Sequence, residues 1–327
     1  MRVIALEEHF SLPFAAERVG PQRIKARGFP PPGGRTAHLG PLLRDVADGR
    51  VADLEANGIS LQILSSAGPG ADLLDGDDGI RLAKDMNDKL ADYVSAHKGR
   101  LAGFAHLPMR SPEAAARELE RSVRELGFLG GLINGMTEDL FLDDPRFDPI
   151  LAAAEQLNVP LYVHPALPPE AVRNIYYGRL PGETGETLAT AGWGWHSETA
   201  LHILRMVVAG TLDKHPKLKL IIGHMGEGLP AMLARCDDVL GPVTTHLSRS
   251  VSATILDQVW VTTAGFLYMP PFLAALTTFG ADRILFSVDY PFTSNQKALP
   301  FLKSLPVSPA DLEKIAHGNA ERVLNIV

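Results

Sequence analysis

Short apolar runs alternate with longer segments of helical character along almost the whole chain. The first run, Val3 to Leu6, is apolar and partly β-branched and contains no turn residue, which predicts a buried strand. Similar runs recur along the chain, and each is followed by a segment that predicts a helix. The expected strands are 3–6, 61–65, 101–106, 130–133, 160–163, 218–222, 259–263 and 284–288.

This regular alternation of strand and helix favours a parallel sheet, and eight such units in 327 residues favour a closed (β/α)₈ barrel. A doubly wound open sheet is the alternative, but no glycine-rich phosphate loop follows the first strand. We expect residues 1–327 to form a single barrel domain. The connection after the first strand carries six glycines and prolines between residues 28 and 34. We therefore expect a long loop insertion there, of the kind that forms lids or subunit contacts.

Polar residues stand directly after several of the expected strands. Glu7 and His9 follow the first strand, His164 the fifth, His224 the sixth and Asp289 the eighth. In a barrel these positions meet at the carboxyl end of the sheet, where active sites form. Each residue also has an ordinary explanation, as a salt-bridged strand end, a loop histidine or a turn-forming aspartate. Their shared position favours one functional site.

The chemistry of these side chains suggests a metal. Glu7, His9, His164 and Asp289 form a mixed oxygen and nitrogen set that suits Zn²⁺ or Mn²⁺ and leaves positions open for substrate. A salt bridge at the strand end is the alternative for Glu7 with His9. The fourth strand ends without a lysine that could bridge a second ion, so we expect one metal.

His224 lies in a glycine-rich bend, which suits an acid–base or orienting group. Glu227 follows three residues later and could hold His224 in one tautomer. Alternatively, Glu227 only caps the helix that begins near Pro230.

Composition excludes several classes of function. The net charge is −7 and no long basic run occurs, which argues against a nucleic-acid or membrane-surface partner. Cys236 is the one cysteine, so a disulfide framework and a CxxC metal site are excluded. The chain has no apolar stretch of about 20 residues and no apolar start of secretory length. We therefore expect a cytoplasmic enzyme.

Four stretches of the chain resemble the amidohydrolase-related non-oxidative decarboxylases. They are 5–10 (ALEEHF), 163–165 (VHP), 224–230 (HMGEGLP) and 286–292 (FSVDYPF). The chain is most similar to γ-resorcylate (2,6-dihydroxybenzoate) and 2,3-dihydroxybenzoate decarboxylases, and more distantly to aminocarboxymuconate semialdehyde decarboxylase. The resemblance runs from the first strand to the C-terminal helix. It implies a metal-dependent barrel whose Zn²⁺ or Mn²⁺ is held by Glu7, His9, His164 and Asp289.

The reaction that the resemblance implies is decarboxylation of an ortho-hydroxybenzoate. The metal holds the carboxylate and the ortho hydroxyl, Asp289 delivers a proton to the ring carbon that bears the carboxylate, and carbon dioxide leaves. His224 is then the catalytic histidine beside the metal, and Glu227 supports it. The resemblance also implies a homodimer or homotetramer in which Arg235 reaches a neighbouring subunit's site. The alternative for Arg235, if the resemblance is set aside, is an ordinary cation on a helix surface.

Further side chains are candidates for the substrate pocket. Tyr290 and Phe292 are expected to line it, Phe10 to stack on an aromatic ring, Arg50 to clamp a carboxylate and Trp193 to narrow the pocket. Core packing is the alternative for the aromatic residues, and a solvated helix surface is the alternative for Arg50.

The segment 193–197 (WGWHS) departs from the pattern of the similar decarboxylases and leaves the identity of the aryl acid open. We interpret His196 as a loop histidine, because nothing in the spacing pairs it with a partner. His106 ends the third expected strand and has no expected role.

A metal-dependent hydrolase or hydratase of the same superfamily, acting on a small aromatic or unsaturated carboxylate, is the alternative function. Near the start of the chain, the hydrolases more often carry two histidines separated by one residue. In this sequence Glu7 replaces the first of those two histidines, which favours the decarboxylases. A non-catalytic barrel would bind no metal, and four converging ligands argue against it.

Overall fold

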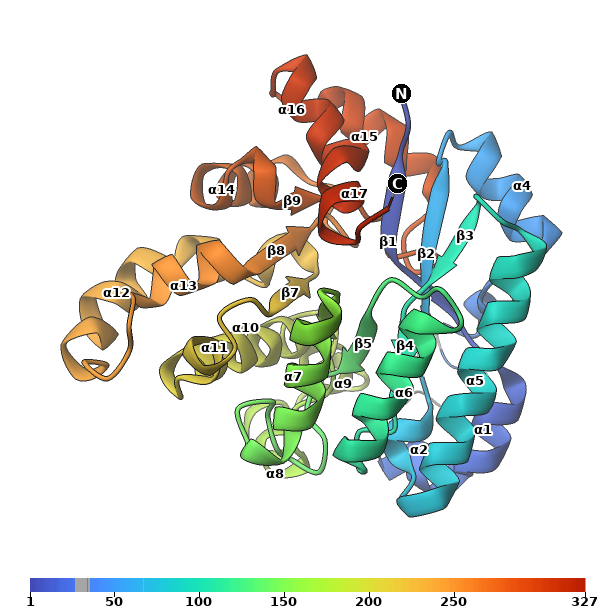
Figure 1. Ribbon diagram of the computed structural model, residues 1–327, viewed down its shortest axis with the longest axis horizontal. Coiled ribbons are helices and arrows are strands. Elements are labelled where there is room, and N and C mark those ends of the chain that lie inside the picture. Colours follow the sequence, from blue (N-terminus) through green and yellow to red (C-terminus); the bar gives the residue numbers. More distant parts are fainter. Residues whose placement is uncertain (27–33, 35, 67, 327) are drawn as a thin grey trace.

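The computed structural model describes residues 1–26, 34, 36–66 and 68–326, and its strands pair in parallel throughout (Figure 1). The strands are β1 (Ile4–Phe10), β2 (Leu61–Ser66), β3 (Leu101–Gly103), β4 (Ala105–His106), β5 (Gly131–Asn134), β6 (Pro160–His164), β7 (Lys219–Ile222), β8 (Val259–Thr262) and β9 (Ile284–Leu285). Each coincides with one of the apolar runs that predicted a strand.

The strands close into a barrel. β3 and β4 are two parts of one interrupted strand, because Phe104 between them donates its N–H to the Leu64 carbonyl of β2 at 2.9 Å while β4 pairs with β5. The first and last strands meet through a parallel bridge between Leu6 and Ser287. The predicted (β/α)₈ barrel is therefore confirmed.

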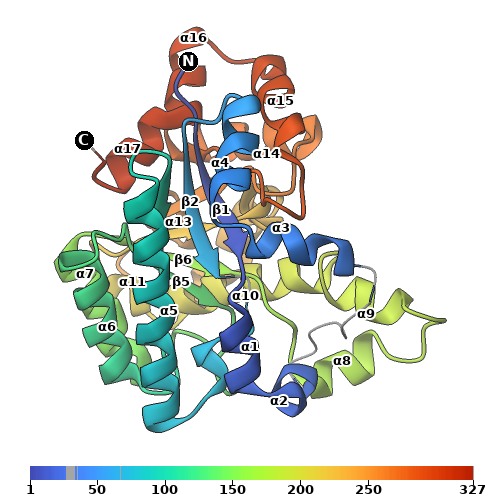
Figure 2. The same cartoon turned by 90° about the vertical axis from the view of Figure 1, so that its right-hand side faces the viewer.

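Helices cover the outside of the barrel, with α5, α6 and α7 side by side along one flank (Figure 2). The α-helices are α1 (Pro13–Val19), α2 (Pro21–Ala26), α3 (Gly40–Arg44), α4 (Asp48–Ala56), α5 (Gly76–Ala96), α6 (Pro112–Arg124), α7 (Asp148–Leu157), α8 (Glu170–Tyr176), α9 (Thr184–Ala189), α10 (Gly194–Val208), α11 (Thr211–Lys214), α12 (Leu233–Leu240), α13 (Val251–Gln258), α14 (Met269–Phe279), α15 (Ala298–Ser304), α16 (Pro309–Glu313) and α17 (Asn319–Val323). None of these described helices combines the length and the apolar character that a membrane crossing demands.

Two apolar clusters stabilise the fold. The inner cluster fills the barrel with side chains from the strands, and α17 contributes Ala320 and Val323 to it. The outer cluster packs the outward-facing strand residues, such as Ala5 and Phe10 of β1, against the surrounding helices. Fully burying one large aliphatic side chain contributes about 1.5–3 kcal/mol to the free energy of folding. The two clusters together therefore stabilise the barrel that positions the strand ends.

The insertion after β1 is partly helical. Pro13 begins α1 and Pro21 begins α2, the position where proline costs a helix nothing. The interpretation of this stretch as wholly irregular is therefore wrong for residues 13–26. Five of the six glycines and prolines that predicted a loop fall at 28–33, outside the described residues.

The buried imidazole of His202 ties α10 to the loop after β5. Its Nε2 accepts a hydrogen bond from the Leu142 N–H at 2.9 Å, and its ring meets Phe141 edge to face at 5.0 Å. Next to it, Arg205 forms two bonds to the Asp143 carboxylate at 3.0 and 2.7 Å. Burial lowers the pKa of His202 to about 4, so the ring is neutral where it accepts this bond.

We expect His202 to make folding pH-dependent. The unfolded chain takes up a proton on this imidazole near its ordinary pKa of about 6.5, whereas the folded protein resists protonation down to about pH 4. The free energy of unfolding should therefore fall as the pH drops from 6.5 to 4. His202→Gln should remove about 2 kcal/mol of that decline, measured by urea unfolding at pH 7 and pH 4.5. His246→Gln, at an exposed histidine, is the control, and an equal decline in both variants would contradict the assignment.

Candidate metal centre and active site

A bulge in β1 directs Glu7 into the barrel. The register of β1 against β2 shifts between Ala5 and Glu8, and Glu7 has a φ of 58°. Strict alternation would place Leu6 inside the barrel and Glu7 outside it. The bulge lets both point inward, so that Leu6 packs in the inner cluster and Glu7 reaches the hydroxyl of Tyr162 on β6.

The structure brings together the four residues expected to be metal ligands. Glu7 Oε1 lies 3.4 Å from His164 Nε2, and His9 Nε2 lies 3.3 Å from Asp289 Oδ1. The rings of His9 and His164 meet edge to face with centroids 4.8 Å apart. Glu7 and His9 are buried, whereas the side chains of His164 and Asp289 keep 13% and 15% of their surface exposed. The cluster is therefore reachable from the carboxyl end of the barrel.

Two atoms of this cluster fit a cation. Glu7 Oε1 and His9 Nε2 are both buried and have no hydrogen-bond partner among the described residues. A buried polar atom without a hydrogen-bond partner lowers the stability of the fold by about 1–3 kcal/mol. A divalent ion would satisfy both atoms, and two carboxylates with two imidazoles suit Zn²⁺ or Mn²⁺. The residues present therefore fit one metal ion.

Neighbouring groups fix the orientation of His9. The Ser65 hydroxyl of β2 lies 3.3 Å from His9 Nδ1, which leaves Nε2 to face the cluster. The guanidinium of Arg50 donates to the His9 carbonyl at 2.5 Å, and the His9 N–H donates to the Tyr290 carbonyl at 2.7 Å. Outer partners of this kind orient metal ligands in known sites.

Glu8 points to the outside of the barrel and joins β1 to the segment after β9. Its carboxylate accepts the N–H groups of Val288 at 2.9 Å and Tyr290 at 3.2 Å. Burial raises the pKa of Glu8 to about 8, and the two backbone donors oppose this rise. Glu8 thus holds Asp289, which lies between its two partners, beside His9.

The loop after β7 carries a second buried cluster. His224 Nδ1 lies 2.7 Å from Glu227 Oε1, and His224 Nε2 faces Glu7 at 3.7 Å and Asp289 at 4.0 Å. Burial favours the neutral ring, but the carboxylates of Glu227 and Glu7 outweigh it and raise the pKa of His224 to about 10. Burial likewise opposes the charge of Glu227, but His224 and His196 lower its pKa.

His196 belongs to this cluster, and its interpretation as a loop histidine without a partner is wrong. It lies in the first turn of α10, with Nδ1 2.5 Å from Glu227 Oε2. Its ring packs edge to face on His224 at 4.9 Å and on Phe266 at 5.0 Å. No sequence spacing could show a contact between residues 31 positions apart that depends on how α10 packs beside the β7 loop.

Four residues of the two clusters have backbone conformations that are rare outside glycine. Glu7, His224, Glu227 and Asp289 have φ values of 58°, 50°, 57° and 69°. Each costs roughly 1–3 kcal/mol, and such residues concentrate at functional sites. The strain is the result of directing several acidic and basic side chains toward one small volume.

Two glycines allow the loops to approach this closely. A Cβ at Gly223 would lie 2.5 Å from Glu7 Oε2, and a Cβ at Gly265 would lie 3.1 Å from Asp289 Oδ2. Gly265 also has a φ of +64°. A side chain at either position would push a carboxylate out of the cluster.

Three of the candidate substrate residues are exposed. Phe292 is 47% exposed, and its ring lies 5.7 Å from the ring of His9, at the opening of the cluster. Trp193 is 60% exposed immediately before α10. Arg235 is exposed on α12.

Other candidates are buried behind β1. Arg50 donates to backbone carbonyls, including that of His9, and its guanidinium covers the ring of Tyr290 at 4.8 Å. Phe10 packs in the outer cluster. For these three residues the geometry favours core packing over contact with substrate. His106 Nε2 accepts the Ala71 N–H at 2.9 Å, which gives it a structural role.

Sequence reasoning missed Tyr162. Its hydroxyl contacts Glu7 Oε2 and lies 3.0 Å from Thr262 Oγ1 of β8. Because burial and the Glu7 carboxylate raise the pKa of Tyr162 well above its ordinary value, the hydroxyl stays protonated and donates to Glu7. Tyr162 lies two residues before His164 and therefore on the same face of the strand, and this spacing could have identified it from the sequence.

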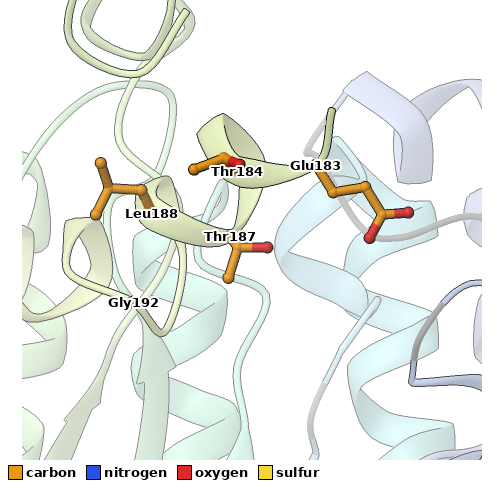
Figure 3. Close-up of a pocket in the computed structure, with 5 residues that line it drawn as sticks. All are labelled: Glu183, Thr184, Thr187, Leu188 and Gly192. Atoms are coloured by element: carbon orange, nitrogen blue, oxygen red, sulfur yellow. The ribbon is translucent and has the colours of Figure 1, made fainter. Parts of the chain in front are cut away.

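A hollow of about 400 Å³ opens on the surface at α9. It is lined by Glu183, Thr184, Thr187, Leu188 and Gly192 (Figure 3). None of the residues of the two buried clusters lines it. The candidate active site is therefore the end of the barrel and not this hollow.

The sequence profile of the family described as Amidohydrolase matches residues 42–326. The chain belongs to the amidohydrolase family. The predicted family resemblance is thereby confirmed.

Several relatives of this chain are decarboxylases. The γ-resorcylate decarboxylase of Polaromonas sp. (strain JS666) is 37% identical over 99% of this chain and 98% of the relative. The crystal structure of 2,6-dihydroxybenzoate decarboxylase complexed with 2,6-dihydroxybenzoate has a TM-score of 0.89 at 34% identity and covers 100% of both chains. The dihydroxybenzoic acid decarboxylase of Polaromonas sp. JS666, with bound manganese and the inhibitor 2-nitroresorcinol, has a TM-score of 0.88 at 36% identity and covers 99% of this chain and 97% of that chain.

Tyr162→Phe should weaken metal binding in this amidohydrolase. The change removes the hydrogen bond that orients Glu7, and loss of such an outer partner typically costs 10–100-fold in metal affinity. We expect the dissociation constant for Mn²⁺, measured by calorimetric titration of the metal-free protein, to rise by about that factor. Tyr93→Phe on α5 makes the same chemical change away from the barrel interior and should leave affinity unchanged. Equal affinity in the two variants would show that Tyr162 does not support the ligand.

Proposed function

We propose that this protein is a metal-dependent, non-oxidative decarboxylase of an ortho-hydroxybenzoate-type aromatic acid, such as 2,6-dihydroxybenzoate. The observation that carries the proposal is the convergence of Glu7, His9, His164 and Asp289 around two buried, unpartnered ligand atoms. The relatives support the substrate class, because one was solved with 2,6-dihydroxybenzoate and another with manganese and a nitroresorcinol. The enzyme is a carboxy-lyase of the amidohydrolase superfamily.

In this proposal one divalent ion is held by Glu7, His9, His164 and Asp289. When bound, the ion acts as a Lewis acid toward the carboxylate and the ortho hydroxyl of the substrate. The donor set suits both Zn²⁺ and Mn²⁺, and the manganese in the relative favours Mn²⁺.

Asp289 is the proton donor in this proposal. Its carboxyl is held between His9 Nε2 at 3.3 Å and His224 Nε2 at 4.0 Å, and it keeps partial exposure to the opening. The proton passes from Asp289 to the ring carbon that bears the carboxylate. The bond from that carbon to the carboxylate then breaks, its electron pair restores the aromatic ring, and carbon dioxide leaves. Solvent returns the proton to Asp289.

His224 orients the reacting groups. Its Nδ1 is engaged with Glu227, so its Nε2 is directed at the space between Glu7 and Asp289. The exposed rings of Phe292 and Trp193 are available to pack on the aromatic substrate at the opening.

Asp289→Asn should keep much of the metal and lose turnover. The amide can still ligate through its oxygen but has no acid proton to deliver, and loss of a general acid typically costs 10²–10⁴-fold. We expect kcat for carbon dioxide release from 2,6-dihydroxybenzoate by the manganese-loaded protein to fall by about that factor. Metal content, measured by mass spectrometry, should stay close to that of the wild type.

Asp92→Asn, on α5 outside the barrel, is the matched control for this substitution. A fully active Asp289→Asn variant would refute the proton role. Wild-type protein that releases no carbon dioxide from any ortho-hydroxybenzoate, but incorporates oxygen from labelled water into a product, would replace the decarboxylase by the hydrolase or hydratase alternative.

We further propose a homodimer or homotetramer in which Arg235 reaches the site of a neighbouring subunit. In Figure 1, α12 and α13 extend away from the strands. Near Arg235, the side chains of Met232, Val239 and Val243 are 51%, 49% and 71% exposed. Apolar exposure of this extent around one short helix is typical of an association surface.

Mixing two inactive variants tests the shared site. Arg235→Gln should lower kcat/KM about 10–100-fold, since it removes a charged hydrogen bond to the substrate carboxylate. When it is mixed with Asp289→Asn under conditions that exchange subunits, each mixed dimer should contain one intact site, and activity should return.

The control is a mixture of Asp289→Asn with His224→Asn. Both of these changes affect the same subunit's own site, so this mixture should stay inactive. If the Arg235 mixture also stays inactive although native mass spectrometry shows mixed oligomers, Arg235 does not serve a neighbouring site.

A further inference from the structure

We propose that His196 is a positioning residue of the active site, held as an imidazolium, that fixes Glu227 and through it the ring of His224. The effect on turnover rests on the proposed function. The protonation of His196 does not, because it follows from the hydrogen bonds around the ring.

Both ring nitrogens of His196 face acceptors. Nε2 lies 3.1 Å from the carbonyl oxygen of Ala191, which can only accept a hydrogen bond. Nδ1 lies 2.5 Å from Glu227 Oε2. Ionised carboxylates also only accept, and the pKa of Glu227 is lowered by the imidazoles on either side despite its burial. Both nitrogens of His196 must therefore carry hydrogen, which makes the ring a cation.

The Glu227 carboxylate is shared between two imidazoles. Oε2 accepts from His196, and Oε1 accepts from His224 Nδ1 at 2.7 Å. With each oxygen engaged, the carboxylate cannot rotate. His224 must then donate through Nδ1, which leaves Nε2 directed at Glu7 and Asp289. His196 thereby fixes the direction of a ring that it meets only at its edge.

Burial, the helix dipole and the neighbouring His224 ring, whose raised pKa makes it a cation near neutral pH, all oppose a cation at this position. His196 is only 8% exposed, and it lies in the first turn of α10, where the helix dipole disfavours positive charge. The dipole amounts to about half a charge spread over a helix end. Glu227 instead places a full charge in contact with the ring, inside a region of low dielectric. Phe266 packs on both imidazoles, at 5.0 Å from His196 and 5.6 Å from His224, and holds the two rings in place.

The turn between α9 and α10 builds this arrangement. A Cβ at Gly194 would lie 2.2 Å from the Ala189 carbonyl oxygen, so glycine permits the tight turn that brings the Ala191 carbonyl to His196. Further along the same helix, His202 fixes α10 to the loop after β5. His196 is therefore supplied by a helix that is fixed on both sides of this residue.

Neutron diffraction on crystals of the manganese-loaded protein, exchanged into heavy water near neutral pH, reads the protonation directly. We expect deuterium on both Nδ1 and Nε2 of His196. Deuterium on only one of them would overturn the proposal. This measurement needs no substrate, so it stays decisive if the proposed decarboxylase activity is not found.

Substitution tests the positioning role. His196→Phe keeps a ring of similar size but donates nothing, and we expect kcat for 2,6-dihydroxybenzoate to fall about 10–100-fold with KM and manganese affinity little changed. His196→Gln keeps one N–H donor for Glu227 and should recover part of this loss. His97→Gln, at a histidine that ends α5 and lies outside the site, is the control and should keep wild-type kcat.

An unchanged kcat in His196→Phe would overturn the positioning role, as would a loss in His97→Gln of the same size. Partial rescue by glutamine would support it, because a purely steric role would favour the aromatic ring over the amide. If His196→Phe does not fold, the positioning role is decided by the kcat of His196→Gln relative to His97→Gln, together with the neutron result.

Discussion

The rest of the site depends on the convergence of three carboxylates, two of them fully buried, at one end of the barrel. Glu7, Glu227 and Asp289 lie within a single layer of side chains, where an uncompensated charge costs several kcal/mol. Burial, together with the neighbouring carboxylates of Asp289 and Glu227, raises the pKa of Glu7 to about 8, although His224 and Tyr162 oppose the rise. Everything around these acids supplies positive charge or hydrogen-bond donors, and the imidazoles of His9, His164, His196 and His224 are the main groups that do so.

The barrel also bears the backbone strain that this convergence requires. Four site residues have positive φ values, and Glu7 reaches the interior only because β1 is bulged. These costs are offset by the inner and outer apolar clusters, on which the strand ends rest. Glu8 adds a direct connection, since it accepts backbone N–H groups on both sides of Asp289. The barrel therefore closes between its first and last strands at the place where His9 and Asp289 meet.

The fold and the four ligand candidates could be predicted from sequence because both depend on local patterns. Eight apolar runs mark the strands, and parallel strands bring the polar residues at their ends together. Contacts set by tertiary packing could not be predicted. Arg50 looked like a surface clamp but is buried under β1, and the pairing of His196 with Glu227 depends on where α10 docks. Tyr162 was concealed by the apolar strand around it, although strand periodicity places it on the face of His164.

The charges of the two clusters form one balance. Glu7, Asp289 and Glu227 contribute three negative charges, and an imidazolium at His196 neutralises that of Glu227. The two that remain match the charge of the one divalent ion proposed for this cluster. Without an ion, the same demand for positive charge falls on protons, which is why the pKa values of Glu7 and His224 rise to about 8 and about 10. A second divalent ion would leave the cluster with excess positive charge. His196 thus completes the electrostatic argument for a mononuclear site: it compensates the one carboxylate that faces away from the ligand cluster.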